Sequence, residues 1–226
     1  MRSSQVLFGV LQHLVRLALE LLYTRFAWAY DAVAWAVSFG RWRAWQQVGV
    51  RALPAGRVLE LGHGPGHLLQ QRLLTGQPTI GLDRSPQMGR LAGRRLRRAH
   101  FEPPLVRAEA QAMPFAAESF AAILATFPTE YILDPRTLDE SRRVLRPGGR
   151  LIVVAGVRIT PNNLPDRLLQ LLYRITGESP PPSDAWRLPT EVEGFHLQVE
   201  SVEAPGARVF LLTAERDRQS QVEQVE

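Results

Sequence analysis

Three glycines at alternate positions follow a short apolar segment, within the run Val58-Leu-Glu-Leu-Gly-His-Gly-Pro-Gly66. These glycines are Gly62, Gly64 and Gly66. Glycines at such spacing let the backbone turn tightly and approach a ligand beyond the carboxyl end of a strand. Glu60 would repel a pyrophosphate but suits the ammonium group of an amino-acid ligand. A dinucleotide site would also need a glycine where this chain has His67, so the run favours S-adenosylmethionine over NAD.

Two further acids stand at the ends of predicted strands. Asp83 ends the second predicted strand, where a carboxylate can accept both ribose hydroxyls of a nucleoside. The alternative for Asp83 is a position before a helix, stabilised by the helix dipole. Glu109 follows the third strand and could accept the exocyclic amine of adenine, with Ala110 and Met113 as apolar walls.

The loop after the fourth predicted strand, Thr126-Phe-Pro-Thr-Glu-Tyr131, is the candidate catalytic segment. Glu130 or Tyr131 could orient or deprotonate a methyl acceptor, whereas helix capping is the alternative for Glu130. His63 could also act as a base, but we expect its side chain to point to solvent. Three other histidines are too scattered for metal-ligand spacing, namely His13, His100 and His196. The chain has no cysteine, which excludes disulfides, thiolate metal sites and thiol catalysis.

Strands and helices alternate between residues 57 and 157, which predicts a parallel sheet with helices on both faces. The predicted strands are residues 57–61, 79–83, 105–108, 121–126 and 150–157, and the predicted helices are 67–74, 86–99 and 135–146. Ser85 and Asp134 each precede a proline and should cap a helix. A helix at 164–175 and a Pro-rich loop come next. Strands at 195–203 and 207–214 must then pair antiparallel, because three residues separate them.

The ordered motifs resemble those of class I S-adenosylmethionine-dependent methyltransferases, in particular the small-molecule group that includes the ubiquinone/menaquinone C-methyltransferases. The motifs are Glu60-Leu-Gly-His-Gly-Pro-Gly66, Asp83, Glu109-Ala-Gln-Ala-Met-Pro-Phe115 and Arg142-Arg-Val-Leu-Arg-Pro-Gly-Gly-Arg150. The resemblance implies an α/β, Rossmann-like, seven-stranded and mostly parallel sheet whose last strand is antiparallel. The chain departs from the family pattern at two positions where Asp is common in the family, Glu109 and Ala121.

The resemblance also implies which residues contact the cofactor, S-adenosyl-L-methionine. Methionine contacts are expected at Glu60, Gly62 and Gly64, a ribose contact at Asp83, and adenine contacts at Met88, Glu109 and Ala110. We add His63, Gly66 and Thr126 to the expected cofactor site, and Tyr30 through a looser match before the first strand. Tyr30 would cover the cofactor as part of a lid.

We divide the chain into an N-terminal helical cap or lid (1–50), a cofactor-binding methyltransferase domain (51–215) and a polar tail (216–226). Residues 6–22 form a helix whose apolar face covers most of its circumference, although polar residues argue against a transmembrane span. Such a helix is either buried against the domain or lies at a membrane surface, with contact through residues 5–45. The alternating Arg and Trp residues at 41–45 could stack on nucleic acid, but no nucleic-acid module accompanies them.

The expected activity is in-line methyl transfer to a small, apolar or lipid-like acceptor. The acceptor pocket should be closed by the N-terminal helices and residues 158–188, which are rich in Leu, Trp and Tyr. The alternative is a non-catalytic cofactor-binding module that acts through its N-terminal helices on a membrane or protein partner. An NAD(P) reductase is disfavoured by His67 and by the absence of lysine. We expect a cytoplasmic protein, with peripheral membrane contact as an alternative; the net charge of +5 is compatible with anionic lipid.

Overall fold

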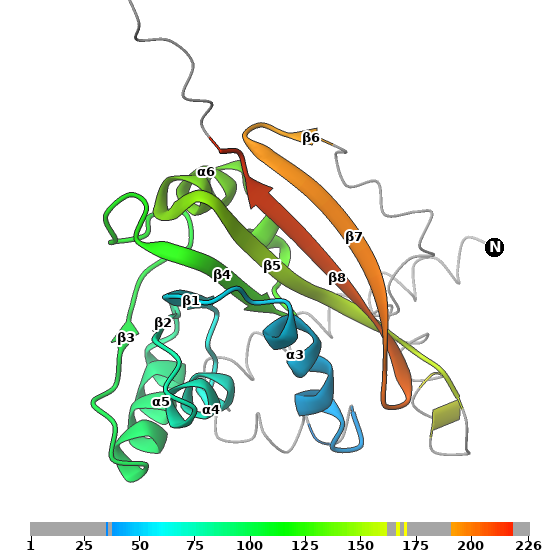
Figure 1. Cartoon of the computed structure of the whole chain (residues 1–226). Coiled ribbons are helices and arrows are strands. Elements are labelled where there is room, and N and C mark those ends of the chain that lie inside the picture. The colour runs from blue at the N-terminus through cyan, green and yellow to red at the C-terminus, as the bar shows by residue number, and fades with distance from the viewer. Residues whose placement is uncertain (1–34, 36–37, 162–165, 168–169, 171–190, 219–226) are drawn as a thin grey trace, which may run out of the picture.

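A single mixed sheet organises the molecule, with helices on both of its faces (Figure 1). The computed structural model describes residues 35, 38–161, 166–167, 170 and 191–218. In these ranges the strand order is β3-β2-β1-β4-β5-β8-β7-β6. The strands are β1 Val58–Leu61, β2 Thr79–Leu82, β3 Leu105–Val106, β4 Phe120–Thr126, β5 Leu145–Ile159, β6 Glu191–Val192, β7 Phe195–Ala204 and β8 Ala207–Arg216.

Strands β1 to β5 are parallel, and β8 pairs antiparallel with both β5 and β7. The predicted Rossmann-like sheet with an antiparallel last strand is therefore confirmed. All seven predicted strands form, and the two-residue β6 is added at one edge, where it pairs antiparallel with β7. We did not predict β6, because a strand of two residues is too short to show a period-two pattern.

The helices in the described ranges are α3 Trp42–Arg51, α4 His67–Leu74, α5 Pro86–Arg98 and α6 Pro135–Val144, with a short 3-10 helix η2 at Glu130–Leu133. Helices α5 and α6 begin where the sequence places their caps. Ser85 Oγ accepts a hydrogen bond from the Met88 amide at 3.3 Å, and Asp134 Oδ1 accepts one from the Arg136 amide at 2.9 Å. Helices α3, α4 and α5 lie on one face of the sheet, and α6 lies on the other (Figure 1).

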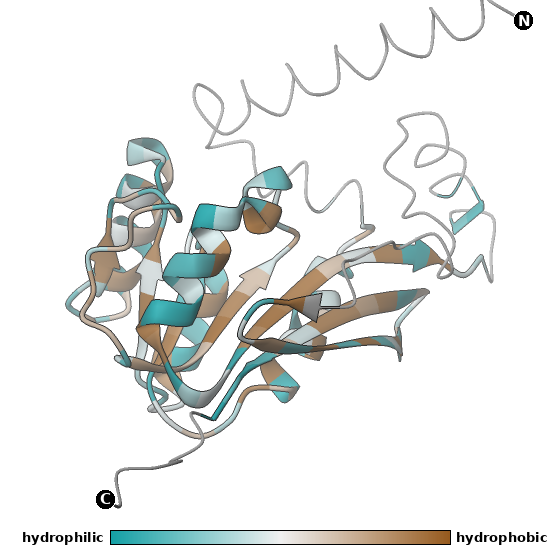
Figure 2. Cartoon of the chain, turned by 90° about the horizontal axis from the view of Figure 1, so that it is seen from above, coloured by the Kyte–Doolittle hydropathy of each residue, from teal (hydrophilic) through white to brown (hydrophobic). Residues whose placement is uncertain are grey.

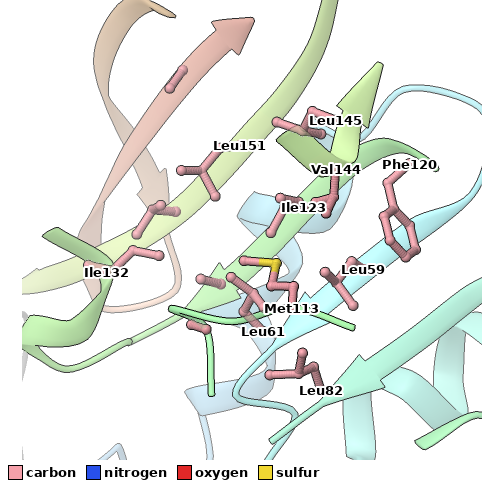
Figure 3. Close-up of a cluster of buried hydrophobic side chains, with 14 of the residues drawn as sticks. Leu59, Leu61, Leu82, Met113, Phe120, Ile123, Ile132, Val144, Leu145 and Leu151 are labelled. Atoms are coloured by element: carbon pink, nitrogen blue, oxygen red, sulfur yellow. The ribbon is translucent and has the colours of Figure 1, made fainter. Parts of the chain in front are cut away.

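Alternate residues of the strands build two separate cores. Leu59 and Leu61 of β1 pack with Met113, α6 and η2 on one face (Figure 3). Val58 packs on the other face with Trp45 of α3 and residues of α4. Seen from above, hydrophobic strands lie between helices whose outer faces are hydrophilic (Figure 2). A strand buried on both faces needs apolar residues at every position, so Glu60, buried within β1, requires a separate explanation.

The Pro-Gly-Gly turn after α6 lies within a strand and not before it. We expected the helix to reach residue 146 and the strand to begin at 150, but α6 ends at Val144 and β5 begins at Leu145. Leu145 pairs with Phe120, and the register then shifts so that Arg150 pairs with Ala122. The extra residues form a bulge, which the left-handed conformation of one of its glycines permits.

The N-terminal segment is described only from residue 35 onwards, apart from residues 36 and 37. The predicted apolar helix at 6–22, Tyr30 and most of the proposed membrane contact lie outside the described residues, as does most of the predicted helix at 164–175. Helix α3 packs firmly on the sheet, because Trp45 is fully buried and its Nε1 donates to Pro205 O at 3.0 Å. No helix in the described part of the chain has the length and apolarity to cross a membrane.

Candidate active site

The glycine turn after β1 adopts a backbone that other residues rarely adopt. Gly62, Gly64 and Gly66 have φ values of 68°, 51° and 78°, all in the left-handed region. Gly66 caps the N-terminus of α4, and a Cβ at this position would lie 2.7 Å from Cβ of Ala92 on α5. The three glycines are therefore required by conformation, and Gly66 also by the close approach of α5.

Glu60 presents an acid to the cavity floor from within the sheet. Its side chain is 3% exposed, and Oε2 has no hydrogen-bond partner among the described residues. Burial raises the pKa of Glu60 to about 8; nearby Arg72 opposes this shift and Asp83 adds to it. A buried, unpaired carboxyl oxygen is costly in an apolar sheet. An ammonium group would supply both the missing hydrogen bond and a compensating charge, so Glu60 fits the amino group of S-adenosylmethionine.

A cavity of about 400 Å³ opens between the glycine turn and α3. The predicted site residues that line it are Glu60, Gly62, His63, Gly64 and Thr126. The other main walls of this cavity were not predicted as site residues; they are Trp35, Trp42, Arg43, Gln46 and His67. Three of these walls belong to, or lie next to, the stretch 41–45 in which Arg and Trp alternate. That pattern was the signal that could have placed α3 at the site.

His63 does not point to solvent, which corrects our expectation. Its side chain is 4% exposed, and a Cβ on Gly81 of β2 would lie 2.9 Å from the ring. The absence of a side chain at Gly81 makes room for the imidazole. Nδ1 of His63 lies 2.7 Å from Gly64 O; a carbonyl can only accept, so Nδ1 carries the proton. Burial lowers the pKa of His63, and the ring is neutral.

Asp83 ties the glycine turn to the start of α5. Its Oδ2 accepts a hydrogen bond from the Gly64 amide at 2.9 Å, and its Oδ1 accepts one from the Ser85 amide at 2.8 Å. Each oxygen keeps a second lone pair. The position before a helix and the predicted role as a ribose acceptor are therefore compatible.

The residues predicted to surround adenine lie outside the cavity walls. Met88 and Ala110 are buried, Glu109 is exposed, and none of the three lines the cavity, nor do Gly66 and Asp83. The cavity corresponds to the region expected for the methionine group and the acceptor. The adenine contacts stay predictions.

The two candidate catalytic residues lie in η2, beside the glycine turn. A Cβ on Gly62 would lie 2.9 Å from the Tyr131 hydroxyl, so this hydroxyl sits against the turn. Glu130 is exposed, and Asp134 and not Glu130 caps α6. Neither candidate lines the cavity.

Polar and aromatic contacts hold α3 against this site. The ring centroids of Trp42 and Phe127 are 4.2 Å apart. Gln46 Nε2 donates to Thr126 Oγ1 at 3.1 Å. Phe127 has a φ of 50°, which is rare for a bulky residue and marks local strain at the end of β4.

Comparisons with known proteins agree with this geometry. A family profile described as a methyltransferase domain matches residues 59–153. A ubiquinone/menaquinone biosynthesis C-methyltransferase of Syntrophotalea carbinolica is 34% identical over 79% of this chain and 80% of its own. A demethylmenaquinone methyltransferase of Tropheryma whipplei is 30% identical over 80% of this chain and 74% of its own.

Solved structures share the fold. The geranyl diphosphate C-methyltransferase of Streptomyces coelicolor, solved with S-adenosyl-L-homocysteine, superposes with a TM-score of 0.57 at 13% identity. The match covers 77% of this chain and 79% of that one. The sheet order, the glycine turn with its buried acid, and these relatives together place this chain among the class I S-adenosylmethionine-dependent methyltransferases, with S-adenosylmethionine as its cofactor.

Proposed function

We propose that this enzyme transfers a methyl group to a ring carbon of an apolar, quinol-type acceptor. The support comes first from relatives with 30–34% identity, whose names describe methyltransferases of ubiquinone and menaquinone synthesis. The observation that carries the proposal is that one cavity joins the glycine turn and Glu60 to an aromatic wall. That wall consists of Trp35 and Trp42.

An aromatic wall suits a flat acceptor ring. Trp35 is 64% exposed, and Trp42 is half-buried at the same cavity. Burying an exposed indole under a ligand is favourable, and aromatic pairs gain about 1 kcal/mol beyond the area that they bury. An apolar acceptor ring would thus bind where the cofactor's methionine region ends.

The cofactor supplies an electrophilic methyl group on a sulfonium. The protein has to align the two reactants and exclude water from between them. When a quinol carbon gains a methyl group, a ring hydroxyl or the ring carbon must lose its proton, so a base assists the reaction. Tyr131, with its hydroxyl against Gly62, is our first candidate to orient or deprotonate the acceptor, and Glu130 is the second.

The test is transfer of labelled methyl from S-adenosylmethionine to reduced demethylmenaquinone, with the oxidised quinone as control. We expect a C-methylated product from the quinol alone, because only the reduced ring is electron-rich enough to attack. Tyr131→Phe should lower kcat about 100-fold if the hydroxyl takes part in proton transfer, while Leu133→Ala on the same short helix should not. Efficient methylation of a polar acceptor with no transfer to quinols would contradict the proposal.

A further inference from the structure

The cavity beside the glycine turn has a positively charged side, and the proposed role of Glu60 assigns no ligand to it. Among the described residues that line it, Glu60 is the only carboxylate, whereas Arg43 adds a permanent positive charge. His67, the first residue of α4, lies on the same wall. The N-terminus of a helix contributes partial positive charge there as well.

A histidine, and not an acid, holds Arg43 at the cavity. Arg43 Nη2 lies 3.1 Å from His67 Nδ1. A guanidinium only donates, so Nδ1 must accept and the proton of the neutral ring is on Nε2. In the described part of the chain, no carboxylate lies within ion-pairing distance of Arg43. The guanidinium therefore keeps donors for an external anion, in the fork geometry that matches a carboxylate.

We propose that Arg43 binds the α-carboxylate of the cofactor's methionine group, opposite the ammonium group bound by Glu60, and that His67 positions the guanidinium. An α-amino acid carries both charges on one carbon. A site that selects an α-amino acid needs an anion and a cation on the walls of one cavity. Glu60 and Arg43 provide this pair, because both line the same cavity. The inference rests on the proposed role of Glu60 but not on the identity of the acceptor.

The competing use of Arg43 is to bind an anionic group on the acceptor. Its place beside His67, at the start of the helix that follows the glycine turn, favours the cofactor. The aromatic wall, Trp35 and Trp42, carries no charged group that would bind an anionic part of an acceptor. An acceptor role would appear in the acceptor KM, whereas the cofactor role appears in binding measured without any acceptor.

Three adenosine ligands with different groups on sulfur separate these uses by calorimetry on the full chain. S-adenosylmethionine carries the carboxylate and the ammonium group, and decarboxylated S-adenosylmethionine keeps the ammonium group and the sulfonium. Methylthioadenosine lacks the carboxylate, the ammonium group and the sulfonium charge. For Arg43→Gln we expect at least about tenfold weaker binding of the first ligand and unchanged binding of the other two. For Glu60→Gln we expect weaker binding of the first two ligands and unchanged binding of the third.

The controls distinguish a ligand contact from a structural effect. Arg51→Gln removes an exposed arginine from the end of the same helix and should leave all three affinities unchanged. Arg43→Lys should recover part of the loss, because it restores the charge without the fork. His67→Ala should weaken the binding of S-adenosylmethionine alone, and by a smaller factor than Arg43→Gln does.

Two outcomes would overturn the inference. One is an equal loss of affinity for all three ligands in an Arg43→Gln variant that unfolds at the same urea concentration as the unmodified enzyme, which would show that Arg43 does not recognise the carboxylate. The other is unchanged S-adenosylmethionine binding with a raised acceptor KM, which would assign Arg43 to the acceptor. A failure to methylate quinols would contradict the proposed function but would leave these binding results as they stand.

Discussion

Glu60 makes cofactor binding depend on pH. Burial raises its pKa to about 8, so in the free enzyme the side chain is neutral at lower pH, whereas an ammonium ligand prefers the ionised form. Binding then releases a proton, and affinity increases with pH. We expect the Kd for S-adenosylhomocysteine to rise about tenfold for each pH unit below about 8 and to level off above it.

Calorimetric titrations between about pH 6.5 and 8.5, in buffers of different ionisation enthalpy, measure both the slope and the released proton. Glu60→Gln should flatten the profile, because an amide does not titrate. Glu109→Gln alters an exposed acid and should keep the slope. A flat profile in the unmodified enzyme would show that Glu60 is already ionised before the ligand arrives.

Gly66 combines a left-handed backbone with a close contact, and a second glycine separates the two effects. A Cβ on Gly66 would lie 2.7 Å from Ala92 Cβ, whereas Gly76, with a φ of 70°, has nothing within 4 Å of its Cβ position. Gly76→Ala should cost about 1 kcal/mol from backbone strain alone. Gly66→Ala should cost about 2 kcal/mol more, because α5 must also move. Urea unfolding measures both; equal losses would show that α5 yields freely.

At the scale of elements, the N-terminus of α3 is fastened to segments from the other end of the chain. Arg41 Nη2 lies 2.5 Å from Asp166 Oδ1, and the Asp166 side chain is 3% exposed. A Cβ on Gly206, in the β7–β8 turn, would meet the Arg41 guanidinium, and Trp45 binds the same turn through Pro205. One ion pair therefore joins α3 to the segment after β5, next to the hairpin.

Removal of Arg41 should show how much this ion pair contributes to the free energy of unfolding. Arg41→Gln leaves a buried carboxylate without its guanidinium, and we expect a loss of about 3 kcal/mol in the free energy of unfolding. The exposed pair between Arg208 and Glu203, with 3.4 Å between N and O, is the matched control. Arg208→Gln should change stability by less than about 0.5 kcal/mol. Similar small losses in both variants would show that the Asp166 carboxylate does not depend on Arg41 for its stabilisation.

Local sequence patterns predicted the helices that begin with a recognisable capping residue. The caps Ser85 and Asp134, each followed by a proline, marked the starts of α5 and α6, because each side chain accepts a hydrogen bond from an amide in the first turn. The Pro-Gly-Gly sequence did not predict a single local structure in the same way. The same residues serve to end a helix or to make a bulge, and pairing of Leu145 with Phe120 decided for the bulge.

At the scale of the whole molecule, the sequence located one side of the site and missed the other. Glu60 and the glycine turn were predictable, because the carboxyl ends of parallel strands meet at one edge of the sheet. Arg43 and Trp42 reach the cavity only through the docking of α3 across β5 and the hairpin, a contact between residues far apart in the chain. His63 was misplaced because the space that it fills is left by Gly81 on another strand.

The position of β8 sets the order in which the site can be completed during synthesis. β8 inserts between β5 and β7, and its turn with β7 holds Trp45 of α3. When the ribosome has produced the glycine turn and Glu60, neither β5 nor the β7–β8 hairpin that anchors α3 has been made. A nascent chain therefore carries α3 and Glu60, the proposed ligand of the cofactor's ammonium group, long before it has the hairpin that holds α3 at the cavity.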